Sequence, residues 1–230
     1  MTDTTTNERL AAAEALEQRA GKEAAERSAV AGAYVDDPAH DHHITNTGIS
    51  NPKLAMWVFL GSECLLFGGL ISTFLLYKNN NLAGGPTPHD VYDIELTSIS
   101  SFVLLMSSLT MVLAVSAIQR GEHARMRLWL VSTALLGGTF IGGQAYEFQV
   151  FVKEGLGFTT NSAGSAFFAL TGFHGVHVTI GIVMLLSTVI LSAVGRIPRA
   201  RAEAVEIVGL YWHFVDIVWV LIFTVVYLIP

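Results

Sequence analysis

The sequence predicts an all-α fold, that of a polytopic membrane protein with five transmembrane helices. Of its 230 residues, 52% are hydrophobic and only 14% are charged, and the mean hydropathy is +0.51. Soluble domains carry about 25% charged residues, so this composition excludes that class. Five apolar segments are long enough to cross a hydrocarbon core of about 30 Å, which takes about 20 helical residues. They are residues 54–77, 96–118, 128–150, 166–194 and 207–229.

Polar connectors separate the five segments and contain residues that interrupt helices. The first segment follows the turn-rich DDPAHDHHITNTGISNP, and KNNNLAGGPTPHDVYD divides it from the second. QRGEHARMR divides the second from the third, and FVKEGLGFTTNSAGS divides the third from the fourth. GRIPRARAEAVE leads into the fifth. Gly, Pro, Asn and charged residues are typical of turns, so we expect five helices joined by loops.

The distribution of basic residues predicts the orientation in the membrane. If the N-terminal tail lies on one side, the loops at 119–127 and 195–206 lie on that side too. This side holds 11 Lys and Arg residues, and the opposite side holds two, Lys78 and Lys153. By the positive-inside rule, we expect the N-terminus in the cytoplasm and the C-terminus outside.

Residues 1–50 are predicted to be a hydrophilic cytoplasmic tail, partly helical or disordered, ahead of a transmembrane domain at 51–230. The first residues lack the apolar core of a signal peptide, so we expect no cleaved leader. His40, His42 and His43 are interpreted as part of a hydrated linker, because no further metal ligands follow at a fixed spacing. With a net charge of −6 and no basic cluster, we expect no nucleic-acid partner.

Ionisable side chains inside the predicted spans are the candidate functional residues, because such groups are costly in lipid and normally face a bundle interior or a partner chain. Three polar pairs, Gln144 with Glu147, His174 with His177, and His213 with Asp216, are spaced i,i+3, so each pair shares one helix face. The ionisable residues are Glu63, Glu147, His174, His177, His213 and Asp216.

Two interpretations of these residues are open. The histidines could bind haem, or a metal if Glu147 joined them, although His174 and His177 share one helix. We favour hydrogen-bonded links between helices or subunits, each worth about 0.6 to 2 kcal/mol, with small residues that allow helix backbones to approach. Trp219 is expected to pack against a partner or lipid. The glycines concerned are Gly137, Gly138, Gly142, Gly143, Gly172, Gly175 and Gly181.

Depth along the helices predicts which ionisable groups meet. Glu63 and Asp216 each lie nine residues from the cytoplasmic start of their segments, about 13 Å in, so they could share a cluster with His213. Glu147, His174 and His177 could form a second cluster nearer the outer face. Glu63 lies in the apolar FLGSECLLF, where loss of hydration favours its protonated form, so it is either a proton relay or a neutral hydrogen-bonding acid.

Four stretches resemble the signature segments of subunit III of the haem–copper respiratory oxidases. They are MWVFLGSECLLFGGLIS at 56–72, GQAYEF at 143–148, FFALTGFHGVHVTIG at 167–181 and YWHFVDIVW at 211–219, with Glu206 just ahead of the last. The resemblance covers residues 48–230 in the family's order. The two further N-terminal helices of the seven-helix members are replaced here by a hydrophilic tail, so the chain resembles the five-helix bacterial form.

The resemblance implies an accessory subunit of a proton-pumping terminal oxidase that carries no haem, copper or other metal and catalyses nothing itself. It implies direct contact with subunit I, association with subunit II and other respiratory subunits, bound phospholipid, and support of proton uptake into subunit I in a bacterial plasma membrane. Glu63 matches the family's carbodiimide-reactive carboxylate. The remaining residues are expected to make lipid, interhelix or intersubunit contacts: Glu147, His174, His177, Glu206, His213, Asp216 and Trp219.

Alternatives remain at this point. Glu63 within the SE pair favours the cytochrome c oxidase type, but quinol oxidases and nitric-oxide reductases have a similar accessory subunit. An independent membrane protein with its own haem is the competing class, and a transporter is disfavoured because no repeat or pair of broken helices is visible.

Overall fold

The computed structural model describes residues 18–19, 22, 50–78, 94–195 and 202–229. Nearly all of the predicted tail, including His40, His42 and His43, falls outside the described residues, so that prediction is untested. Residues 52–230 form one compact unit, to which the contacts given below belong.

The described residues are almost entirely helical. Five helices among the described residues are long and apolar enough to cross a membrane, and no strand occurs in these parts of the chain. The predicted all-α fold with five membrane-crossing helices is therefore confirmed. In order, the elements are α2 (Asn51–Tyr77), α4 (Ile94–Gln119), α5 (His123–Lys153), α6 (Ser162–Ala193), α7 (Ala202–Phe223) and the π-helix η2 (Thr224–Leu228).

Each helix begins two to five residues before the apolar segment predicted for it. A polar side chain that satisfies the free backbone groups of a helix end allows the helix to begin before the apolar residues do. Asn161 is an example, since its side chain accepts a 2.6 Å hydrogen bond from the backbone of Gly164 at the start of α6.

Glycine ends α5 in a geometry that an L-residue rarely adopts. Gly155 has φ 90°, and the backbone N–H groups of Gly155 and Leu156 donate to the carbonyls of Val152 and Phe151. This is a Schellman motif, which satisfies the last carbonyls of the helix and turns the chain toward α6.

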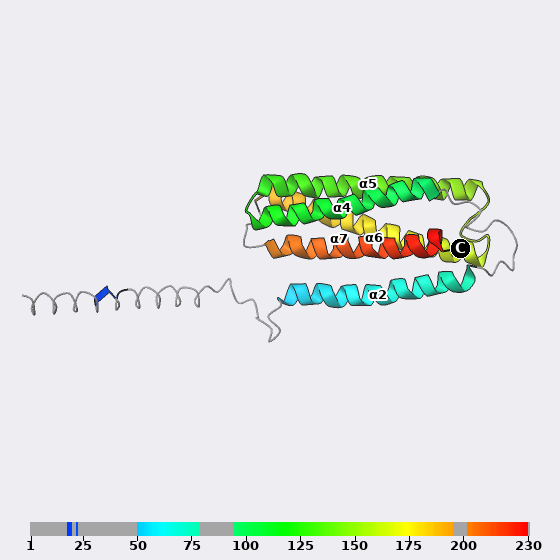
Figure 1. Ribbon diagram of the computed structural model, residues 1–230, viewed down its shortest axis with the longest axis horizontal. Helices are drawn as coiled ribbons and strands as arrows, with labels where there is room; N and C mark the ends of the chain where they lie inside the picture. The colour runs from blue at the N-terminus through cyan, green and yellow to red at the C-terminus, as the bar shows by residue number, and fades with distance from the viewer. Residues whose placement is uncertain (1–17, 20–21, 23–49, 79–93, 196–201, 230) are drawn as a thin grey trace, which may run out of the picture. The chain divides into compact units, whose positions relative to one another are not determined.

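Helices α4 to α7 pack side by side in a bundle, with α4 next to α5 and α7, and α6 next to the same two helices (Figure 1). The indole of Trp212 on α7 fills the centre of this bundle and is 1% exposed. A Cβ atom added to Gly137 or Gly181 would lie 2.5 or 2.9 Å from that ring. These two glycines therefore make the room that the indole occupies.

The other glycines divide into two groups. A Cβ atom added to Gly143 or Gly175 would meet a polar side chain at 3.0 Å, so these positions are also close approaches between helices. The prediction that the glycines allow helix backbones to approach closely is wrong for the remaining three. An added Cβ would meet nothing within 4 Å at Gly138, Gly142 and Gly172.

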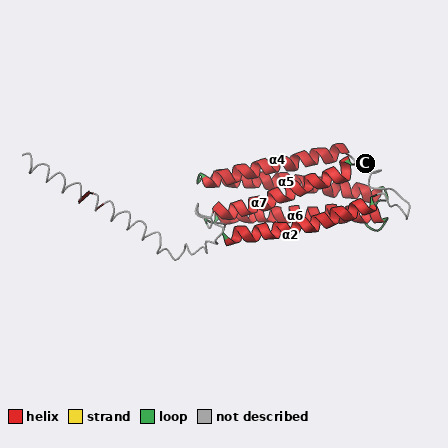
Figure 2. Ribbon diagram, turned by 60° about the horizontal axis from the view of Figure 1, so that its bottom comes forward, coloured by secondary structure: helices red, strands yellow, loops and turns green. Residues whose placement is uncertain are grey.

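Helix α2 lies beside the bundle (Figures 1 and 2). Only Leu60, Phe67 and Phe74 are buried, and 11% of its most apolar window is buried, against 28–50% in the other four helices. The two ends of α2 are tied to the last helix by Lys53, which pairs with Glu206, and by Lys78, which donates to the carbonyl of Ile229. Most of α2 is thus available to lipid or to a partner chain.

Candidate functional site

A carboxylate and an imidazole meet between α2 and α6. Glu63 Oε2 lies 3.1 Å from His177 Nε2, and the two side chains are 14% and 11% exposed. His177 Nδ1 lies 2.7 Å from the carbonyl of Phe173, and the ring of Phe67 stands edge-on to the imidazole at 5.0 Å. The pair is therefore fixed in orientation and shielded on one side by an aromatic ring.

The hydrogen bonds of His177 determine what this pair can do chemically. The carbonyl of Phe173 can only accept, so Nδ1 carries a hydrogen and donates it. One further proton lies between Nε2 and Glu63, and it makes either a neutral acid beside a neutral imidazole or an ion pair. The pair is thus a site that holds one proton in two possible positions.

The predicted clustering of Glu63 with Asp216 and His213 is wrong, because Glu63 pairs with His177 instead. Because the helices begin before the apolar segments, Glu63, His177 and Asp216 are all near the middle of their helices. Similar depth therefore does not select the partner. The partner of Glu63 is determined by the side of the bundle on which α2 packs.

His174 links α6 to α7 and is fully buried. Its Nε2 donates to the carbonyl of Val215 at 3.2 Å, and the rings of Phe140 and Trp219 lie 5.8 and 4.8 Å from its own. Nδ1 is buried without a hydrogen-bond partner among the described residues. His174 and His177 share a helix face, as predicted, yet they contact different helices.

His213 and Asp216 lie together on the face of α7 that packs against α4, as their spacing predicts. Ser108 Oγ is 2.5 Å from Asp216 Oδ2 and 3.1 Å from His213 Nδ1, so one hydroxyl bridges the two side chains. Asp216 is 5% exposed, and its Oδ1 has no partner in the part of the chain that the structure describes.

Glu147 lies at the other end of the bundle from the Lys53–Glu206 pair. Its Oε1 accepts hydrogen bonds from Thr97 at 2.7 Å and from Tyr227 at 3.2 Å, and it is 6% exposed. Tyr227 belongs to the π-helix η2, whose wider turn is a common local feature of functional sites. The predicted cluster of Glu147 with the two α6 histidines is replaced by this link among α4, α5 and η2.

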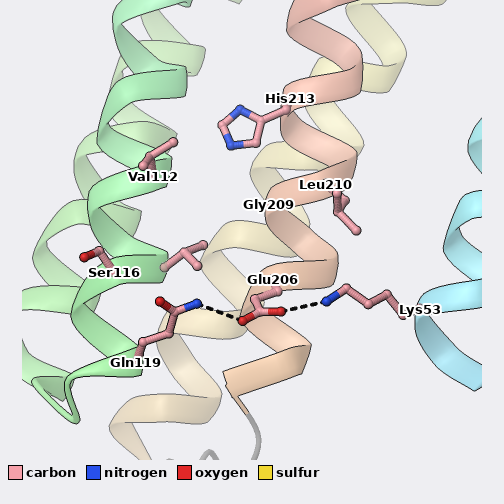
Figure 3. Close-up of a pocket in the computed structure, with 9 residues that line it drawn as sticks. Lys53, Val112, Ser116, Gln119, Glu206, Gly209, Leu210 and His213 are labelled. Carbon is pink, nitrogen blue, oxygen red and sulfur yellow. Dashed lines mark hydrogen bonds and ion pairs between the residues drawn. The ribbon is translucent and has the colours of Figure 1, made fainter. Parts of the chain in front are cut away.

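Glu206 begins a polar network at the first turns of α7 (Figure 3). Its two carboxylate oxygens accept from Lys53 Nζ at 2.9 Å and from Gln119 Nε2 at 3.0 Å. These three side chains stand at one end of a groove of about 330 Å³, and His213 stands farther along it. The walls between them are apolar and include Val112, Val115, Gly209 and Leu210.

Comparison with known proteins places this arrangement in a family. Residues 35–229 match the family described as cytochrome c oxidase subunit III. The chain is 41% identical over 192 residues to cytochrome c oxidase subunit 3 of Bacillus subtilis, covering 83% of this chain and 92% of that relative. It is 42% identical over 176 residues to quinol oxidase subunit 3 of the same organism, covering 76% and 85%.

The chain belongs to the cytochrome c oxidase subunit III family. A third relative, the probable quinol oxidase subunit 3 of Staphylococcus saprophyticus, is 37% identical over 195 residues, which are 85% of this chain and 94% of the relative. The family resemblance predicted from the four signature stretches is thus confirmed. Membership makes the chain an integral membrane protein and an accessory subunit of a terminal oxidase, which works together with other oxidase subunits.

Subunit III of this family has no metal centre of its own. Within the described residues, no three His, Cys, Asp or Glu side chains come together where they could hold a metal ion. His174, His177 and His213 each hydrogen-bond a group on another helix, so they do not converge as a ligand set would.

Several residues of these networks were missed by the sequence reasoning. The hydroxyl partners on α4 were missed although Thr97, Ser101 and Ser108 recur at i, i+4 and i+11, a polar stripe on one helix face. Trp219 was expected to contact lipid or a partner, but it is 2% exposed and donates to Ser101 at 2.9 Å. Of the contacts predicted for Trp219, the interhelix contact is present. Lys53 and Gln119 were not singled out because each is an ordinary residue at a predicted helix end.

Proposed function

We propose that this chain is the subunit III of a proton-pumping terminal oxidase of the cytochrome c oxidase type in a bacterial plasma membrane. It packs directly against subunit I, associates with subunit II, and leaves haem and copper to those partners. Its N-terminus faces the cytoplasm, in accord with the excess of Lys and Arg on that side.

The observation that carries this proposal is the Glu63–His177 pair. A carboxyl group and an imidazole meet near the middle of two helices, at 3.1 Å and with both side chains less than 15% exposed. A structural link would need neither an acid nor a base, since two neutral polar groups hydrogen-bond equally well in a membrane. The pair supports a role in sustaining proton uptake by the neighbouring subunit I.

The exposure of α2 supports the proposed contacts with lipid and with subunit I. Large apolar side chains cover its outer surface, among them Val58 at 69%, Leu65 at 80% and Leu76 at 71% exposure. A helix this apolar and this little buried needs lipid tails or another protein helix around it. We propose that bound phospholipid and subunit I share this surface.

A quinol oxidase is the second candidate, and it is favoured by one specific observation. Identity to the quinol oxidase subunit 3 of Bacillus subtilis, at 42%, matches the 41% to its cytochrome c oxidase counterpart. In this proposal the electron donor site lies on another subunit of the complex. The two candidates are therefore separated by assaying the purified complex with cytochrome c and with quinol as electron donors.

The test replaces Glu63 by Gln in the intact complex and follows oxygen consumption during sustained turnover. We expect haem content to stay unchanged, the initial rate to change modestly, and the activity to decay faster than in the wild type. Glu147→Gln is the matched control, since Glu147 is a buried carboxylate that accepts hydrogen bonds from the hydroxyl groups of Thr97 and Tyr227. Equal behaviour of both variants would refute the proton role of the pair, and loss of subunit I haem in Glu63→Gln would refute the accessory role.

A further inference from the structure

A second hydrogen-bonded group of polar side chains joins α4 and α7 and does not include the Glu63–His177 pair. We propose that His213, Ser108 and Asp216 form a proton-exchange relay that opens into the groove between α4 and α7. The relay is a property of this chain and does not rest on the function proposed above. In this relay, His213 takes up the proton from the groove and Asp216 is its final acceptor.

The hydrogen-bond geometry allows the relay to run in either direction. Ser108 has one hydroxyl hydrogen and lies between two partners, at 2.5 Å from Asp216 Oδ2 and 3.1 Å from His213 Nδ1. In one arrangement His213 Nδ1–H donates to Ser108, which donates to the carboxylate. In the other, protonated Asp216 donates to Ser108, which donates to Nδ1. Both arrangements keep both hydrogen bonds.

The two arrangements differ by one proton, and the transfer between them balances. A hydronium ion among the waters of the groove gives a proton to His213 Nε2, where an N–H bond forms, and remains as a neutral water. Nδ1 gives its hydrogen to Ser108 Oγ, and Ser108 gives its original hydrogen to Asp216 Oδ2. The result is a neutral carboxylic acid and a neutral imidazole with its hydrogen on Nε2, and the reverse sequence releases the proton.

Burial gives Asp216 a reason to accept this proton. The residue is 5% exposed, and its Oδ1 lacks a partner among the described residues. A buried, charged carboxylate with an unpaired oxygen costs free energy, and taking up a proton removes the charge.

The groove supplies the route from the membrane surface. It measures about 330 Å³ and is lined by His213 at its inner part and by Lys53, Glu206 and Gln119 at the end of α4 (Figure 3). A water takes about 30 Å³ in the liquid, and polar groups at both ends can hydrogen-bond it, so the groove can hold a short file of waters. The ion pair marks the end nearest the Arg-containing turn between α4 and α5.

No other titratable group competes for this position in the described contacts. On α6, His174 contacts the carbonyl of Val215 on a different face of α7. His177, also on α6, contacts Glu63 of α2. On α2, Lys53 pairs with Glu206 at the groove's end. On α4 the group next to Asp216 is the neutral hydroxyl of Ser108.

Infrared spectroscopy of the purified complex tests the relay. The carboxylic acid C=O band of Asp216 is identified as the band that titrates with pH and is missing in Asp216→Asn. After transfer to heavy water, its shift reports the rate of proton exchange. We expect this exchange to slow at least about tenfold in Ser108→Ala and His213→Phe, because a positioned proton donor speeds transfer by at least that factor.

Two controls keep the test decisive. Ser108→Thr restores a hydroxyl at the same position and should retain the wild-type exchange rate, and Glu147→Gln should leave the Asp216 band unchanged. The proposal is overturned if Asp216→Asn removes no titrating band. It is also overturned if Ser108→Ala and His213→Phe exchange at the wild-type rate, as they would if an acyl chain kept the groove dry.

Discussion

Substitution of Gly137 by Ala tests the packing of the bundle around Trp212. An added Cβ would lie 3.0 Å from Cζ2 of the indole and 2.5 Å from Cη2, and the second distance is closer than real Cβ atoms approach other groups. Trp212 is 1% exposed and donates to Ser107 at 3.0 Å, so its ring cannot withdraw without losing that hydrogen bond. The ring or the α5 backbone must shift.

Overpacking of this kind costs about 1–3 kcal/mol of unfolding free energy. For a domain of 150–250 residues, each kcal/mol lowers the melting temperature by about 2–4 °C, so the expected decrease is about 2–12 °C. The assay heats the tagged protein in mild detergent and records the temperature at which half of it leaves the soluble fraction.

Gly138→Ala is the matched control on the same helix. An added Cβ there meets nothing within 4 Å, and alanine is a better helix former than glycine, so the control should melt at or slightly above the wild-type temperature. If Gly137→Ala melts with the wild type, or if both variants lose the same stability, the packing of α5 against Trp212 has been described wrongly.

Two further predictions concern the Lys53–Glu206 pair and the proposed orientation in the membrane. A double-mutant cycle of Lys53→Ala and Glu206→Ala, measured by the same melting assay, should give a coupling free energy of less than about 1 kcal/mol. This coupling should weaken as salt is added, because the two side chains are 34% and 27% exposed. A larger coupling that does not depend on salt would contradict this prediction. A membrane-impermeant thiol reagent should label Lys153→Cys in intact cells and Arg125→Cys only after the membrane is opened, and the reverse pattern would invert the proposed orientation.

Hydropathy was sufficient to predict the five helices, because a chain in lipid must satisfy its backbone hydrogen bonds internally and helices do so within one segment. It was not sufficient for the helix ends. Asn161 caps α6 before the apolar residues begin, and Gly155 ends α5 after they stop. Capping groups, rather than apolar residues, set these boundaries.

The polar contacts were predictable along each helix but not between helices. The i,i+3 spacing correctly placed His213 and Asp216 on one face, where Ser108 joins them. The same spacing placed His174 and His177 together, yet one contacts α7 and the other contacts Glu63 on α2. Depth can be counted from a sequence, whereas the lateral neighbour depends on how the helices pack.

The hydroxyl residues of α4 are a sequence signal from which contacts between helices could have been predicted. Its hydroxyl residues Thr97, Ser101 and Ser108 follow one face of the helix, and each bonds a polar group of another element. Isolated serines and threonines in apolar helices usually bond their own backbone, as Thr139 does here. A periodic row of them predicts a polar interhelix seam.

The most direct test of the proposed function is co-purification from the native membrane. The tagged chain is extracted in mild detergent, its partners are identified by mass spectrometry, and the reduced-minus-oxidised spectrum is recorded before and after the partners are stripped away. We predict that a haem–copper subunit I accompanies the chain and that the haem signal leaves with it. A chain that purifies alone and retains stoichiometric haem would contradict the accessory role.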